Sequence, residues 1–146
     1  MNEADLTWCL VDKESELETI EESYYLGCYT PLNTIIDIKL QAWNNRFGQE
    51  KISDIENPIL NIYFDTLEDS KLLEYCSVKI DDQPFKKIDI VSNVGSIPLN
   101  RLLSGEVNMG EQDSYNNYCS ICIRFSNFEK NMKNGLKNLI VDIQYS

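Results

Sequence analysis

The chain has 146 residues, the size of one ordinary domain, and 42% of them are hydrophobic, so a sizeable core can form. Its formal net charge is -11, and its 13 basic residues are scattered along the sequence. Phosphate binding needs clustered lysine and arginine, so we expect no nucleic-acid partner and no binding to an anionic membrane surface.

The chain contains no histidine. Histidine is the usual general base and the commonest metal ligand, so we expect no enzyme, no metal site and no cofactor. The five cysteines are an odd number at uneven spacing, which indicates reduced thiols in a protein made in the cytoplasm. The N-terminus is acidic and unlike a signal peptide, and no apolar run is long enough for a transmembrane helix.

Residues 1–30 differ from the remainder of the chain, because the range 12–22 carries six acidic residues. Leu17, Ile20 and Tyr24 follow the spacing of one helical face. The segment is predicted to be a short amphipathic helix or an acidic arm, and an interaction tail is the alternative.

From residue 34 onward apolar and polar residues alternate, which is typical of half-buried strands. The pattern predicts one all-β domain over residues 31–146, built as a two-sheet antiparallel sandwich of jelly-roll or immunoglobulin type. The order of the strands does not follow from the pattern. The runs with strand character are 34–43, 57–66, 71–80, 85–91, 118–126 and 134–146.

Cys119 and Cys122 form a C-x-x-C pattern, a spacing used in metal sites and in redox sites. They fall within an alternating run, and residues three apart on a strand point to opposite faces. Two such thiols do not bind one zinc ion unless the backbone turns between them. We therefore predict ordinary strand cysteines, with Cys119 facing inward and Cys122 facing outward.

Several aromatic side chains are placed by the alternation on the polar faces of strands or at strand ends, where we expect them to be exposed. Exposed aromatics form protein contacts, stack on sugar rings, or simply cover a partly buried face. A connection of about a dozen polar residues, 104–117, is unusually long and is a further candidate contact region. The N-terminal arm is a candidate as well, because an arm can add a strand to the sheet edge of a neighbouring copy. The candidate interface residues are therefore Trp8, Leu10, Tyr24 and Tyr25 of the arm, and the aromatics Trp43, Tyr63, Tyr75 and Tyr118.

The stretches "WNNRFG", "RLLSGEVNMG" and "NGLKNLIVDIQY" resemble small β-sandwich structural proteins of tailed bacteriophages, which occupy capsid accessory, neck, tail and fibre-attachment positions. The resemblance implies a non-enzymatic virion assembly protein, made in the host cytoplasm, that contacts other structural proteins and copies of itself. It carries no functional residue over to this chain.

A carbohydrate-binding module of β-sandwich type is the alternative function. In it, Trp43 and the tyrosines would stack on sugar rings, with or without calcium bound by loop carboxylates in 66–70 and 81–83. No EF-hand spacing is present, so those carboxylates are interpreted as polar turn residues. A small-molecule ligand is not expected.

Overall fold

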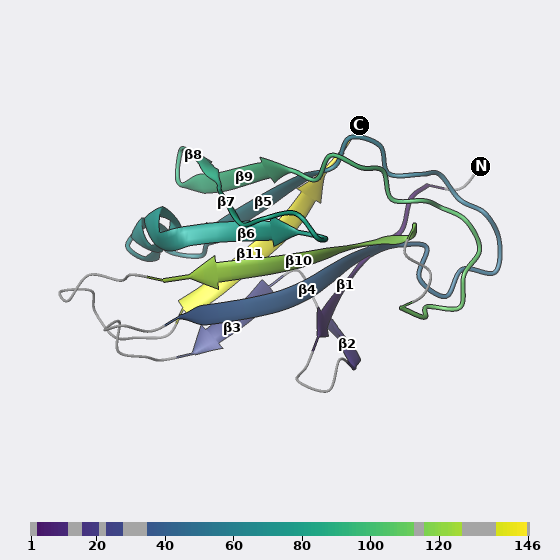
Figure 1. Ribbon diagram of the computed structural model, residues 1–146, viewed down its shortest axis with the longest axis horizontal. Coiled ribbons are helices and arrows are strands. Elements are labelled where there is room, and N and C mark those ends of the chain that lie inside the picture. The colour runs from purple at the N-terminus through teal and green to yellow at the C-terminus, as the bar shows by residue number, and fades with distance from the viewer. Residues whose placement is uncertain are drawn as a thin grey trace.

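The computed structural model describes residues 3–11, 16–20, 23–27, 35–112, 116–126 and 137–145. Their strands form two antiparallel sheets that pack face to face, so the predicted all-β sandwich is confirmed (Figure 1). No helix in this part of the chain is long and apolar enough to span a membrane.

The first sheet has the strand order β2-β1-β4-β10-β6-β7, and the second has the order β3-β11-β5-β9-β8. In chain order the elements are β1 (Leu6–Val11), β2 (Leu17–Ile20), β3 (Ser23–Gly27), β4 (Ile36–Asn44), β5 (Ile59–Phe64), the 3₁₀ helix η1 (Asp69–Tyr75), β6 (Cys76–Ile80), β7 (Lys86–Lys87), β8 (Asp89–Val91), β9 (Val94–Pro98), β10 (Tyr118–Phe125) and β11 (Lys137–Gln144).

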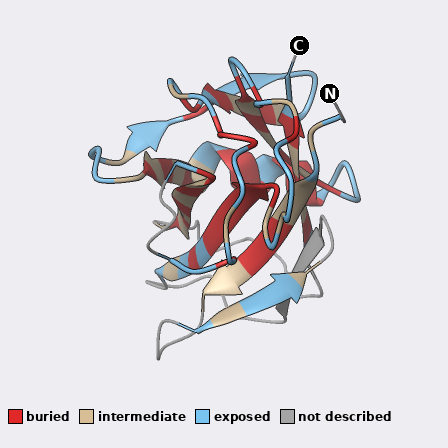
Figure 2. Ribbon diagram, turned by 90° about the vertical axis from the view of Figure 1, so that its right-hand side faces the viewer, coloured by how far each residue is buried: buried red, intermediate tan, exposed pale blue. Residues whose placement is uncertain are grey.

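The longer strands alternate between the two sheets along the chain. When the short strands β2, β7 and β8 are left aside, β1, β4, β6 and β10 lie in the first sheet, and β3, β5, β9 and β11 lie in the second. Neighbours within each sheet are therefore far apart in sequence, as in the pair of β4 and β10. On β5, β6 and β10 every second residue is buried and fills the space between the sheets, where Figure 2 shows the buried positions.

The cysteines of the C-x-x-C pattern lie on β10 with the predicted orientation. Cys119 is fully buried in the core, whereas Cys122 is half-buried on the outer face. Burial, assisted by the neighbouring carboxylate of Asp81, raises the pKa of the Cys119 thiol to about 12. Cys119 is therefore a protonated core side chain at neutral pH, and the pair does not form a shared site.

The predicted N-terminal helix is wrong, because Leu17–Ile20 forms β2, which pairs with β1. On its other side β1 pairs with β4, and its Trp8 side chain is only 2% exposed within the core. Backbone pairing and the burial of Trp8 decide this structure, and the helical spacing of Leu17, Ile20 and Tyr24 does not. The predicted boundary between residues 30 and 31 stays a prediction, but β1 and β3 are strands of the two sheets.

Candidate functional site

Trp43 is not an exposed platform, which corrects the prediction for this residue. Its side chain is fully buried on the outer face of β4, and its ring stacks on Tyr118 with 4.6 Å between the ring centroids. Its indole Nε1 donates a hydrogen bond to Oε1 of Gln41 at 3.0 Å, and the Arg46 guanidinium lies 5.4 Å from its ring. Trp43 therefore has no free face for stacking on a sugar ring.

The other candidate aromatics do not converge on one surface. Tyr63 is half-buried on β5 in the second sheet, whereas Tyr118 is half-buried on β10 in the first. Tyr75, at the end of η1, packs against the core, and so does Leu10 on β1. The side chains of Tyr24 and Tyr25 on β3 lie outside what the structure describes. Among the described side chains the predicted sugar platform does not form, and the interface role of these residues stays a prediction.

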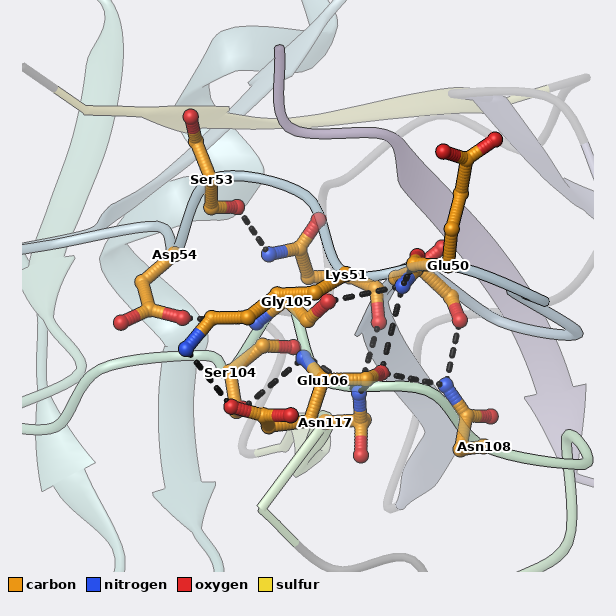
Figure 3. A network of polar contacts seen from close by, with 11 residues as sticks. Glu50, Lys51, Ser53, Asp54, Ser104, Gly105, Glu106, Asn108 and Asn117 are labelled. Carbon is orange, nitrogen blue, oxygen red and sulfur yellow. Dashed lines mark hydrogen bonds and ion pairs between the residues drawn. The ribbon is translucent and has the colours of Figure 1, made fainter. Parts of the chain in front are cut away.

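The long connection 104–117 is anchored to the rest of the protein by buried asparagine side chains (Figure 3). Nδ2 of Asn117 donates hydrogen bonds to the backbone oxygens of Ser104 and Glu106, each at 2.9 Å. Nδ2 of Asn45 donates to the backbone oxygen of Gly105 at 2.7 Å. The amides thus satisfy carbonyl groups of the connection that have no partner in a sheet.

The same network ties this connection to the loop 45–58, which runs beside it at one end of the sandwich (Figure 1). Nδ2 of Asn44 donates to the backbone oxygens of Ser53 and Leu103, at 2.9 and 3.1 Å. At the surface, Lys51 and Glu106 form an ion pair at 2.7 Å. The polar composition of the connection therefore reflects internal hydrogen bonding. Sequence reasoning missed this role, because asparagine is also the ordinary residue of exposed turns.

Apolar side chains nevertheless project from the tips of the two loops. Phe47, Val107 and Met109 are all exposed, with 78% of Met109 accessible to solvent. Phe47 lies against Gly110, where an added Cβ would be 2.3 Å from a ring carbon. We call Phe47, Val107 and Met109 the loop-tip residues.

A pocket of about 420 Å³ opens at the edge of the sandwich, where β6 and β7 of one sheet face β8 and β9 of the other. All of its lining residues come from the range 78–101, and we call it the edge pocket. Its apolar lining is Val78, Ile80, Pro84, Ile97, Pro98 and Leu99, and its polar lining is Asp81, Gln83, Lys86, Lys87, Asp89, Ser96, Asn100 and Arg101.

The crossing from β7 to β8 positions one side of the edge pocket. Ile88, the residue between the two strands, is buried and closes this edge of the core. It packs on Gly95 of β9, where an added Cβ would lie 2.2 Å from Cδ1 of Ile88. A side chain at position 95 would therefore have to displace the end of the Ile88 side chain from its place at this edge of the core.

Asp81 positions the other side of the edge pocket. It follows β6 in a turn with a φ angle of 50°, a conformation that aspartate adopts more readily than most residues. Its Oδ1 accepts a hydrogen bond from the backbone N–H of Ser120 at 3.0 Å, and its Oδ2 forms an ion pair with Nη1 of Arg101 at 3.0 Å. The carboxylate thus fixes the turn to β10 and holds Arg101 at the pocket.

The hairpin of β6 and β7 is also held against the outer face of the first sheet. The guanidinium of Arg124 on β10 lies 4.2 Å from the centre of the Phe85 ring, just before β7. Arg124 is itself oriented by Asp37, whose Oδ1 accepts a hydrogen bond from Nε at 2.7 Å. This hydrogen bond lowers the pKa of the Asp37 carboxyl. The wall of the edge pocket is therefore a braced hairpin.

Across the described ranges, no three side chains of His, Cys, Asp or Glu lie close enough together to hold a metal ion. Two of the loop carboxylates considered as calcium ligands are in environments that do not form a calcium site. Asp69 is buried in the first turn of η1, and Asp81 is paired with Arg101.

No protein-family model and no curated protein matches the chain. A solved structure that matches is that of AvmM, described as catalysing macrocyclization in alchivemycin A biosynthesis. The two chains are 10% identical, the match covers 86% of this chain and 76% of the other, and the TM-score is 0.46. A likeness this distant assigns no reaction and no substrate to the present chain.

The predicted function, a non-enzymatic component of a bacteriophage virion, is corrected and not carried further. The matched chain is described as catalysing a reaction, which differs from that prediction and from the prediction that the chain is not an enzyme. The match supplies no activity for the present chain. The resemblance to phage proteins and the virion location were not tested by any match and stay predictions.

Proposed function

We propose that this protein is a small-molecule-binding β-sandwich domain that holds its ligand in the edge pocket. The observation that carries the proposal is the pocket itself, about 420 Å³ with an apolar lining and polar groups around it. Ligand sites are typically concave, about 300–1,000 Å³, and mostly apolar with a few polar groups that orient the ligand. The proposal departs from the sequence-based expectation of no small-molecule ligand, which no comparison tests.

The lining residues favour binding over catalysis. Asp81 is engaged by Arg101 and by the N–H of Ser120, and the hydroxyl of Ser96 donates a hydrogen bond to Oδ1 of Asn61 at 2.8 Å. The chain has no histidine to activate a nucleophile. An apolar ligand body would gain roughly 0.8 kcal/mol for each methylene removed from water.

Filling the edge pocket tests the proposal. Leu99 lines the pocket, so Leu99→Phe places a larger ring in the space that a ligand would occupy. We expect the affinity for the fluorescent probe anilinonaphthalene sulfonate to fall by roughly tenfold or more, because an occupied pocket cannot bury the probe. The measurement is a fluorescence titration, with the thermal midpoint of unfolding as a check on folding.

Leu67→Phe is the matched control, because Leu67 is 75% exposed and does not line the edge pocket. It adds the same bulk at the surface and should leave probe affinity unchanged. Equal probe affinity in the two variants, with both folded, would overturn the proposed function.

A further inference from the structure

We propose that the ligand of the edge pocket is an amphipathic anion, whose acidic group is bound by Lys86 and whose apolar body lies on the pocket floor. The inference rests on the proposed function and adds the chemical class of the ligand. Its basis is a lysine that projects into the space between the two sheets at their open edge.

The register of β6 and β7 sets the direction of Lys86. Lys86 lies opposite Val78 in this antiparallel pair, and directly opposed residues project from the same face of a sheet. Val78 is fully buried between the two sheets, so Lys86 also projects to the inner side. Because β7 is the last strand of its sheet, the lysine reaches the edge pocket and stays exposed to solvent.

The charges around the pocket leave the Lys86 ammonium uncompensated. Arg101 is neutralised by its ion pair with Asp81. Nζ of Lys87 donates a hydrogen bond to the backbone oxygen of Glu74 at 3.3 Å, on the outer side of the hairpin. Within the described residues no ion pair or hydrogen bond is formed by Lys86, including with Asp89, the other acid of the pocket.

Three basic and two acidic side chains line the edge pocket, whereas the protein as a whole has a formal net charge of -11. Such a chain repels anions in general, so anion binding requires lysine or arginine gathered at the site. Lys86 supplies a charge-assisted hydrogen-bond donor beside the apolar surfaces of Val78 and Ile97. This combination suits a carboxylate or sulfonate attached to an apolar body.

Two probes that differ by one acidic group test the inference. Anilinonaphthalene sulfonate carries a negative charge, whereas phenylnaphthylamine has the same apolar body without it. We expect Lys86→Met to weaken sulfonate binding by roughly fivefold to tenfold and to leave phenylnaphthylamine binding within about twofold, because only the charged contact is lost. Higher salt should weaken sulfonate binding alone.

Lys71→Met is the matched control, because Lys71 is exposed on η1 and does not line the pocket. It changes the net charge of the protein by the same amount and should leave both affinities unchanged. If Lys86→Met and Lys71→Met bind the sulfonate equally well, while Leu99→Phe still blocks both probes, the proposed ligand class is wrong and the pocket remains a binding site. If Leu99→Phe blocks neither probe, the proposed function itself fails.

An inward lysine on an edge strand also discourages pairing with another sheet edge. If preventing such pairing were the only role of Lys86, the Lys86→Met variant would self-associate, as measured by size-exclusion chromatography, and would keep the probe affinities of the native chain. This outcome would overturn the inference.

Discussion

Replacing Trp8 by alanine should lower the free energy of unfolding by about 3–5 kcal/mol, the usual cost of truncating a large buried aromatic side chain. Trp8 is 2% exposed and belongs to the core cluster that both sheets share. Domains of this size have a total stability of about 5–15 kcal/mol, so the loss is a large fraction of it. The measurement is equilibrium unfolding in urea, read from the denaturant midpoint.

Trp8→Phe tests whether packing alone accounts for the contribution of Trp8 to stability. The indole N–H of Trp8 has no hydrogen-bond partner within the described residues, so a phenyl ring keeps part of the packing and loses no hydrogen bond. We expect it to lower the free energy of unfolding clearly less than the alanine variant does.

A chain without residues 1–30 should lose cooperative unfolding, because β4 loses its neighbour β1. If that shortened chain unfolds with the native midpoint, the N-terminal strands are not part of the folded unit.

Removing the side chain of Asn117 should lower the free energy of unfolding by about 1–3 kcal/mol, the usual cost of an unsatisfied buried polar group. Asn117→Ala leaves the backbone oxygen of Ser104 without its donor, in a region where Asn117 itself is 4% exposed. The backbone oxygen of Glu106 also loses its bond from Asn117 but keeps those from Nδ2 of Asn45 and of Asn108, at 3.2 and 3.3 Å. Urea unfolding measures the loss, and amide hydrogen exchange should show faster exchange in 103–117 and in the facing loop 45–58.

Asn116→Ala is the control for this network. The side chain of Asn116 is exposed, and this substitution removes the same atoms as Asn117→Ala does. It should change the free energy of unfolding by no more than about 0.5 kcal/mol. Equal effects of the two substitutions would contradict the account of the long connection as a segment anchored by buried amides.

The strands could be predicted because their inner faces repeat every second residue. Leu60, Ile62 and Phe64 on β5 are buried as the alternation requires, and Cys119 and Cys122 take opposite faces of β10 for the same reason. The partners of each strand could not be predicted, because every connection between long strands crosses to the other sheet. Alternation specifies which face of a strand is buried and carries no information about its neighbours.

The candidate site was missed for the same physical reason. The range 78–101 reads as two strands, turns and an ambiguous segment, and its hollow exists only because β6 and β9 belong to sheets that face each other. The burial of Trp43 was missed because Tyr118 and Arg46 cover it across strands and from a loop. The alternation of apolar and polar residues along the strand, taken alone, predicted that the side chain at position 43 faces solvent.

The most direct test of the edge pocket as a ligand site is a backbone-amide NMR titration of the native protein with anilinonaphthalene sulfonate. We predict saturable shifts that concentrate in residues 78–101, with Lys86 and Leu99 among the affected amides. Shifts that centre on the loop-tip residues Phe47, Val107 and Met109, or an absence of saturable shifts in 78–101, would contradict the proposal.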